Sequence, residues 1–267
     1  MTLPGHWSEM PAEAFRALPA QAVAVLPLGA TEQHGPHLPT GVDSLLVRGV
    51  LDRALPQLPA GTPVLALPVL EITRSGEHDA WPGTISLGPP ALLDLLEQIG
   101  ASVARAGVGR LFLLNGHGGN TALLEVAVRE LRKSQGLITA HASWFGFADT
   151  ADWGPEALAE DLHGGDLETS AMLALRPDLV RMDRAGVFTT RLGNWARETP
   201  AIGLSGQPVR PGWLAQDLQP TGAMGDAAEA TREKGEKLLA SAARGLAQAL
   251  EQFMRFSPAP PEDGGRG

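Results

Sequence analysis

The sequence contains no cysteine, so disulfides, thiolate metal ligands and a cysteine nucleophile are excluded, and any metal must be held by imidazole and carboxylate groups. Basic residues are outnumbered: 21 Lys and Arg stand against 30 Asp and Glu, a formal net charge of −9. This balance argues against nucleic acid and against an anionic membrane as partners. Because no apolar stretch is long enough to span a membrane and no signal-like segment begins the chain, we expect a cytoplasmic protein.

The order of apolar segments predicts an α/β fold, a three-layer sandwich with helices on both faces of a mostly parallel sheet. We expect one domain over residues 1–256 and a disordered tail over 257–267. Residues 148–222 are expected to make lids and subunit contacts. The predicted strands are 22–28, 63–70, 110–114 and 137–144, and the predicted helices are 44–55, 89–106, 120–133, 166–175 and 226–256.

The loop after the first predicted strand, LGATEQHGPHLPTGVD, carries Glu32, His34 and Asp43. Oxygen and nitrogen ligands from one loop suit hard or borderline divalent cations. A solvated loop with no ligand role is the alternative, since Asp and Glu are usually exposed. The glycines and prolines of the loop restrict its path, which favours preorganised ligands.

The loop after the third predicted strand, NGHGGN, places His117 among glycines. The glycines alone would make a tight turn between a strand and a helix, with the histidine as filler. A phosphate cradle is a further alternative, but the segment matches neither the dinucleotide fingerprint nor the Walker pattern. Because the carboxyl ends of parallel strands lie at one edge of a sheet, we expect His117 to join the ligands of the first loop.

A third segment, HGGDLETS, contains His163 and Glu168. Glu168 opens a predicted helix, where a carboxylate is favoured by the helix dipole, so a capping role is an alternative to a catalytic or ligand role. A titratable imidazole near a metal-activated water suits proton transfer to a leaving amine. We therefore predict that His163 is the general acid.

Other histidines and tryptophans receive weaker assignments. We expect His37 to point away from the loop and support a ligand through a carboxylate, and His78 to contact substrate and not a metal. His6 and His141 have no predicted role. The tryptophans are expected in the core or at interfaces, which are their usual places.

The segments LGATEQHGPH, PGTISL, NGHGGN, HGGDLETS and PDLV, in this order, resemble the creatininase family, also called creatinine amidohydrolase-like proteins. The resemblance covers about residues 23 to 236. It implies an α/β sandwich around a parallel sheet, two divalent metal ions and a homohexamer.

Matched by position to that family, Glu32 and His117 would hold one metal and His34 the other, with Asp43 bridging both. The family's proton-transfer imidazole falls on His163. Ser75 matches a position that contacts substrate in creatininases.

This chain also departs from the creatininase pattern. Creatininases read His-Tyr-Glu where Gly118 and Gly119 follow His117 here, and the sequence contains no tyrosine. Gly118 thus takes the place of an aromatic substrate contact, and Gly119 that of a carboxylate ligand of the second metal. Leu162 and Ala159 replace two further residues of that branch. We therefore do not expect creatinine as substrate, and we predict that Glu168 completes the second metal's ligands.

The resemblance implies hydrolysis of a non-peptide amide or cyclic C–N bond of a small molecule, through a hydroxide shared by two Zn, Mn or Fe ions. Alternatives within the family are a deformylase of formamidopyrimidine intermediates and a peptidase that matures a peptide-derived cofactor. A non-catalytic metal-binding scaffold or sensor is the alternative of another class. An open coordination position and a candidate acid argue against it.

Overall fold

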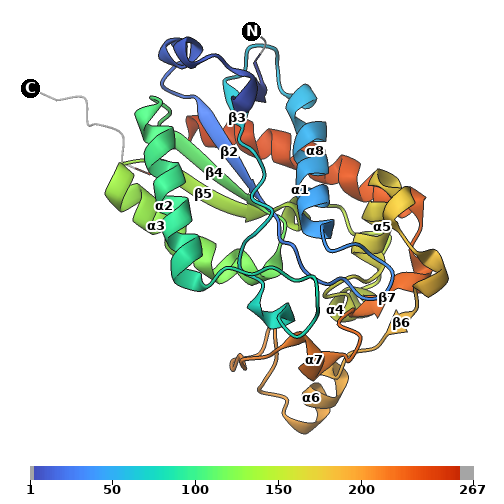
Figure 1. The fold of residues 1–267 in the computed structure, drawn as a ribbon. Helices are drawn as coiled ribbons and strands as arrows, with labels where there is room; N and C mark the ends of the chain where they lie inside the picture. Colours follow the sequence, from blue (N-terminus) through green and yellow to red (C-terminus); the bar gives the residue numbers. More distant parts are fainter. Residues whose placement is uncertain (1–2, 259–267) are drawn as a thin grey trace, which may run out of the picture.

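The computed structural model describes residues 3–258, and its centre is a parallel sheet of strand order β1-β3-β2-β4-β5 (Figure 1). Buried β-branched and leucine-rich runs form the inner strands, as expected for strands covered on both faces. The strands of this sheet are β1 Gly5–His6, β2 Val23–Leu28, β3 Val64–Ala66, β4 Arg110–Asn115 and β5 Ile138–Ser143. A second, antiparallel pair joins β6 Val187–Phe188 to β7 Gly225–Asp226.

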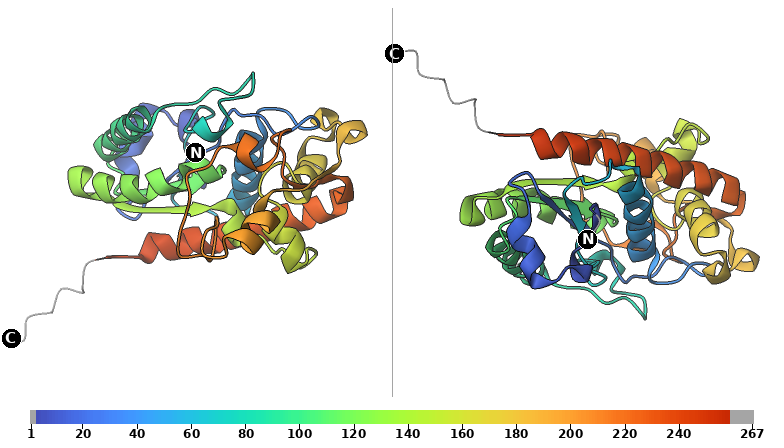
Figure 2. Two further views of the ribbon diagram at one scale, coloured as in Figure 1. Left: turned by 90° about the horizontal axis from the view of Figure 1, so that it is seen from below. Right: turned by 90° about the horizontal axis from the view of Figure 1, so that it is seen from above.

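Helices cover both faces of the sheet, so the predicted three-layer α/β fold is confirmed. Along β2, Val23 and Val25 face one core, shared with α1, α5 and α8, while Ala24 and Leu26 face the other, shared with α2 and α3. Figure 2 shows the red α8 and the green α2 and α3 on opposite sides of the strands. The helices are α1 Val42–Ala54, α2 Pro89–Arg105, α3 Thr121–Gln135, α4 Pro155–Glu160, α5 Asp166–Leu175, α6 Leu192–Glu198, α7 Ala215–Leu218 and α8 Arg232–Arg255.

Some predicted boundaries were wrong. The strand expected over 63–70 pairs regularly only to Ala66, because Pro68 lacks the N–H that a ladder requires, although Leu70 returns to bridge Leu28. The helix expected from Asp226 begins at Arg232, since the Thr231 side chain accepts a hydrogen bond from the Lys234 N–H and caps it there. Strand β1 was not predicted from the sequence.

The segment 148–222 contains more structure than the one helix predicted for it. Besides α5, it contributes α4, α6, α7 and β6, which gather at one end of the molecule in Figure 1. Its role in lids and subunit contacts stays a prediction, as does the single domain over 1–256. Of the expected tail, residues 259–267 lie outside the described residues.

The sheet topology brings two of the predicted site loops together. Strands β2 and β4 are neighbours, yet α1, which follows β2, and α3, which follows β4, lie on opposite faces of the sheet. A crevice opens at the carboxyl ends of such strands, where open α/β sheets bind their ligands. Residues 29–41 and 116–120 both begin at this crevice.

None of the helices within residues 3–258 combines the length and apolarity needed to cross a membrane.

Candidate metal centre

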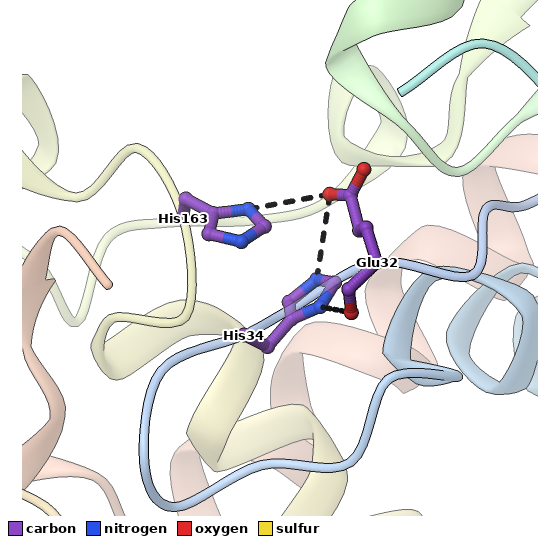
Figure 3. Close-up of side chains that lie close together, drawn as sticks. All are labelled: Glu32, His34 and His163. Atoms are coloured by element: carbon purple, nitrogen blue, oxygen red, sulfur yellow. Dashed lines mark hydrogen bonds and ion pairs between the residues drawn. The ribbon is translucent and has the colours of Figure 1, made fainter. Parts of the chain in front are cut away.

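Glu32 lies at the centre of a buried cluster of imidazoles. Its Oε1 is 3.9 Å from His34 Nε2, 3.6 Å from His78 Nε2, 3.2 Å from His117 Nδ1 and 3.5 Å from His163 Nδ1. Figure 3 shows His34 and His163 turned toward this carboxylate. Residues far apart in the sequence therefore meet where the sequence predicted a shared pocket.

Asp43, in the first turn of α1, bridges two of these imidazoles. Its Oδ1 lies 3.3 Å from His34 Nε2, and its Oδ2 lies 3.3 Å from His117 Nδ1. Two sets of side chains that share Asp43 each present ligand atoms within 4.8 Å of one another. One set is Glu32, Asp43 and His117, and the other is His34, Asp43 and Glu168. A third set, Glu32, His34 and His163, also meets this criterion, so the division of the ligands between two metals stays a prediction.

The donor atoms of this cluster fit divalent cations. Within residues 3–258, Glu32 Oε1, His34 Nε2 and Asp43 Oδ2 are buried without a hydrogen-bond partner. Buried polar atoms are normally paired, because leaving one unpaired costs about 1–3 kcal/mol. A cation ligated by these oxygen and nitrogen atoms would satisfy all three.

The first loop fixes which nitrogen of His34 faces the centre. The loop is closed by a 2.9 Å hydrogen bond from the Glu32 N–H to the Thr40 carbonyl. His34 Nδ1 lies 3.1 Å from the carbonyl of Glu32, and because a carbonyl only accepts, Nδ1 carries a proton. Nε2 is thereby directed at Asp43 and Glu168, and the backbone itself determines the ligand atom.

The two asparagines of NGHGGN hold the second loop in place. Asn115 Nδ2 donates to the His117 carbonyl at 2.7 Å, and its Oδ1 accepts from the His117 N–H at 3.2 Å. Asn120 Nδ2 donates to Thr73 Oγ1 at 3.1 Å and ties this loop to the segment after β3. Sequence analysis missed these roles, although an asparagine on each side of the histidine was a usable signal.

Gly116 allows the second loop to approach the start of α1. A Cβ there would lie 2.8 Å from the Asp43 carbonyl oxygen and 3.2 Å from that of Leu28. Both are backbone atoms, so the clash would be relieved only by moving β2, α1 or the loop. We expect Gly116→Ala to cost about 1–3 kcal/mol and to lower Tm by about 5 °C in a thermal melt.

Gly118→Ala is the matched control for that change. Gly118 is exposed, and a Cβ there meets open space, so Tm should change by less than about 1 °C. Equal effects of the two substitutions on Tm would contradict the steric argument.

The predicted general acid, His163, lies at the cluster with its tautomer fixed. Its Nε2 is 2.6 Å from the Gln33 carbonyl, so this nitrogen carries the proton and donates it. Nδ1, with its lone pair, faces Glu32. The ring lies between those of His34 and His78, with centroids 4.1 and 4.2 Å away. His163 Nδ1 thus receives a proton before it can give one.

Glu168 lies where either of the two roles that the sequence left as alternatives could apply. It is the third residue of α5, and its Oε2 accepts a 2.6 Å hydrogen bond from the Gly164 N–H just before the helix. The same oxygen lies 3.7 Å from His34 Nε2. This hydrogen bond holds the carboxylate beside His34, and its role as a metal ligand stays a prediction.

His78 has a hydrogen bond that favours substrate contact over ligation. The Gln33 amide nitrogen, 2.8 Å from His78 Nδ1, only donates, so His78 carries its proton on Nε2, the atom facing Glu32. Gln33 Oε1 accepts from the Gly35 N–H and its Nε2 donates to the Gly222 carbonyl, which fixes the amide's orientation. Sequence analysis assigned Gln33 no role.

Ser75 and His37 have partners other than those expected. Ser75 is fully buried and its hydroxyl donates to Glu32 Oε2, so it orients a candidate ligand where we expected a substrate contact. For His37 the prediction of a carboxylate partner was wrong: Nε2 lies 2.9 Å from Thr169 Oγ1, and the ring stacks on Phe188. The loop turns before His37 and brings its ring to α5, where the side chain that it meets is the Thr169 hydroxyl.

The tryptophans are distributed mostly as expected. Trp144 and Trp153 are buried in the core, at 0% and 6% exposure. Trp81 is half-buried and instead lines a cavity of about 390 Å³ beside His34. The cavity's lining residues are uncharged apart from the candidate ligand: Gln33, His34, Gly35, Pro36, Leu38, Thr40, Trp81, Pro82 and Thr221.

The pKa values of the cluster follow from burial and close opposite charges. Burial opposes a charge on His34, but Asp43, Glu168 and Glu32 outweigh it and raise the pKa of His34 to about 9. His117 behaves likewise, with its pKa raised well above the usual value by Glu32 and Asp43. Burial, followed by the charge of His34, lowers the pKa of His163 well below its usual value. Burial raises the pKa of Glu168 to about 7.

The sequence matches the creatininase family model, described as creatinine amidohydrolase, over residues 8–250. Among curated relatives, the mycofactocin precursor peptide peptidase of Mycolicibacterium smegmatis is 32% identical over 86% of this chain and 85% of that protein. Creatinine amidohydrolase of Pseudomonas putida is 34% identical over 92% of this chain and 94% of that protein.

Solved structures agree with the sequence matches. A manganese creatininase superposes with a TM-score of 0.74 at 31% identity, covering 93% of this chain and 98% of that one. The fold, the length of the match and the identity all point the same way. This chain therefore belongs to the creatininase family, whose enzymes hydrolyse C–N amide bonds.

Proposed function

We propose that this chain is a metal-dependent hydrolase that uses two divalent cations to cleave an amide bond. The observation that carries the proposal is the pair of three-residue ligand groups that share Asp43. The buried, unpaired atoms of Glu32, His34 and Asp43 support it, because cations would satisfy them. In this arrangement Glu32 and His117 would hold one metal and His34 and Glu168 the other, and Asp43 would be available to both.

Zn, Mn or Fe bound there would supply a water that is nucleophilic near neutral pH and would polarise the amide carbonyl. The manganese creatininase supports Mn as one choice. The side chains then provide orientation and proton transfer. Ser75 fixes Glu32 through its hydroxyl, and the Glu32 carbonyl fixes His34.

His163 moves the proton in this proposal. Its Nε2 stays bonded to the Gln33 carbonyl while Nδ1 takes a proton from the attacking water and passes it to the departing nitrogen. The low pKa of His163 suits the second transfer, because a weakly basic imidazole releases its proton readily. His78, with Nε2–H near Glu32, is placed to donate a hydrogen bond to a substrate oxygen.

We favour a peptide-derived substrate. The cavity of about 390 Å³ beside His34 is lined by uncharged side chains, among them Trp81 and Pro82, and suits an extended neutral chain. Gly118 in the second loop is exposed and carries no side chain that could obstruct a substrate. The relationship to mycofactocin precursor peptide peptidases supports cleavage of a peptide that matures into a cofactor.

A small non-peptide or cyclic amide is the second candidate. The sequence analysis placed this class first, and the P. putida creatinine amidohydrolase supports it. The absence of tyrosine and the glycine at position 118 argue against creatinine itself. Formamides, the substrates of the deformylase alternative, are included in the substrate panel described next.

Metal analysis followed by a substrate panel tests the proposal. The purified protein should contain about two metal ions per chain and, reconstituted with Mn²⁺, Zn²⁺ or Fe²⁺, should cleave precursor-like peptides faster than creatinine or formamides. Light scattering of the same sample tests the predicted homohexamer. Turnover without metal, or two bound metals with no turnover on any amide, would contradict the enzymatic proposal and favour the scaffold alternative.

Metal affinity should rise with pH. His34, with a pKa of about 9, His117, with a pKa raised well above its usual value, and Glu168, with a pKa of about 7, must each lose a proton before they can ligate. Each released proton tightens apparent binding about tenfold per pH unit below its pKa. We therefore expect the Kd for Mn²⁺ to fall steeply from pH 6 to 7 and less steeply up to 9. Calorimetry in two buffers of different ionisation enthalpy measures the released protons, and a flat Kd would contradict this.

A further inference from the structure

His117 has a carboxylate on the side that faces away from the candidate metals. Its Nδ1 lies 3.2 Å from Glu32 Oε1 and 3.3 Å from Asp43 Oδ2, whereas its Nε2 lies 3.4 Å from Glu77 Oε1. If Nδ1 ligates a metal through its lone pair, the ring's proton is on Nε2, the nitrogen on the side of Glu77; among the described residues Nε2 has no hydrogen-bond partner, so the 3.4 Å pair would have to close slightly to form that bond. A ligating histidine is usually oriented by such a carboxylate, and the loss of that partner weakens metal binding about 10–100-fold.

Glu77 is itself held in position. It belongs to the 3-10 turn Gly76–His78, and its Oε2 accepts a 2.7 Å hydrogen bond from Arg74 Nη1. The Arg74 backbone N–H in turn donates to Asn120 Oδ1 at 3.2 Å, which ties this segment to the His117 loop. The Glu77 side chain is 13% exposed, so its charge is only partly screened by solvent.

Gly119 has no side chain, and the space that a Cβ would fill is occupied by the Glu77 carboxylate and the His117 ring. A Cβ at position 119 would collide with both Glu77 Oε1 and His117 Nε2. Gly119 is not among the glycines with positive φ, so the backbone conformation does not require glycine here. The requirement is one of space, at the point where the carboxylate approaches the imidazole.

We propose that Glu77 is a positioning residue that holds His117 with Nδ1 toward the metal pair, and that Arg74 and Gly119 secure that contact. The inference rests on the proposed metal centre and adds to it a residue that does not itself ligate. Nothing local in the sequence marks a carboxylate as the partner of a histidine forty residues away.

Metal titration of the chelator-stripped full chain tests this inference. Zn²⁺ competed against a chromophoric chelator should give two constants for the unmodified protein. In Glu77→Gln, which keeps the side chain's shape but removes its charge, one constant should weaken about 10–100-fold and the other should stay within about threefold. Gly119→Ala should weaken the same constant, because its Cβ would push Glu77 and the His117 ring apart.

The double variant and a surface control make the test specific. Because both changes act through one contact, Glu77→Gln with Gly119→Ala should weaken binding no more than the stronger single change. Glu71→Gln is the control: Glu71 is exposed and paired to Arg48 at 2.9 Å, so its loss should leave both constants unchanged. Additive effects of the two site changes would overturn the shared contact.

Nitrogen-15 NMR of the zinc-loaded chain reads the orientation itself. His117 should show a protonated Nε2 and a zinc-bound Nδ1, and Glu77→Gln should broaden or shift the Nε2 signal, measured below the melting temperatures of both chains. Two zinc ions bound by the unmodified chain with unchanged constants in Glu77→Gln would overturn this inference alone. No stoichiometric zinc in the unmodified chain would instead overturn the metal centre.

Discussion

Replacing Asp43 by asparagine is expected to reduce amide hydrolysis by about 10⁴-fold or more and to remove at least one metal per chain. The two carboxylate oxygens of Asp43 face different imidazoles, His34 and His117, each at 3.3 Å. An asparagine side chain offers one oxygen and one NH₂ group of nearly the same shape. It would therefore leave one cation without its shared ligand and present it with a donor instead.

The experiment measures metal content by elemental analysis and kcat on the best substrate of the panel. Asp94→Asn provides the matched control, because Asp94 is an exposed carboxylate of α2 whose only described side-chain hydrogen bond is the 2.7 Å one from Gln98. That variant should keep both metals and full activity. Two metals per chain in Asp43→Asn, at unchanged affinity, would show that Asp43 does not bridge them.

Stability of the metal-free Asp43→Asn variant has to be measured alongside. Burial disfavours the charged carboxylate, but His34 and His117 outweigh it and hold the pKa of Asp43 below its usual range. A carboxyl with a depressed folded pKa stabilises the fold above its unfolded pKa of about 4, and this contribution is lost as pH falls further. At pH 7 the metal-free variant should therefore be less stable than the unmodified protein, so activity is compared below both melting temperatures.

The location of the centre was predictable because it depends on topology and on residues next to strand ends. Glu32 and His117 follow β2 and β4 within a few residues, and parallel neighbours deliver such residues to one crevice. Glu168 lies beside His34 because a carboxylate three residues into a helix lies near the helix start, and its ligand role stays a prediction. Apolar runs sufficed for the sheet because its inner strands are buried on both faces.

The partners of the site residues were not predictable in the same way. Ser75 bonds Glu32 and Gln33 bonds His78 across 43 and 45 residues, and these contacts depend on how two irregular loops pack. The prediction of a carboxylate partner for His37 was wrong for the same reason, because its partner, Thr169, comes from α5, 132 residues away. A pattern of residue types identifies donors and acceptors, whereas pairing between loops is decided by tertiary packing.

Replacing His163 by glutamine is expected to lower kcat by about 10³-fold while both metals stay bound. The glutamine amide nitrogen can take the place of Nε2 and keep the hydrogen bond to the Gln33 carbonyl, but nothing replaces the lone pair of Nδ1. The proton of the attacking water then has no carrier to the departing nitrogen. KM should change little, because the lost interaction belongs to proton transfer and not to substrate binding.

Metal content decides between the proton carrier and a ligand, since His163 Nδ1 also lies within ligand range of Glu32 and His34. Loss of one metal from His163→Gln, with activity restored by excess metal, would identify a ligand and contradict proton transfer. A second variant, His163→Ala, tests the same point by chemical rescue. It leaves a space between the rings of His34 and His78, and free imidazole that enters this space should restore part of kcat. His141→Gln in β5, away from the centre, should change neither metal content nor kcat.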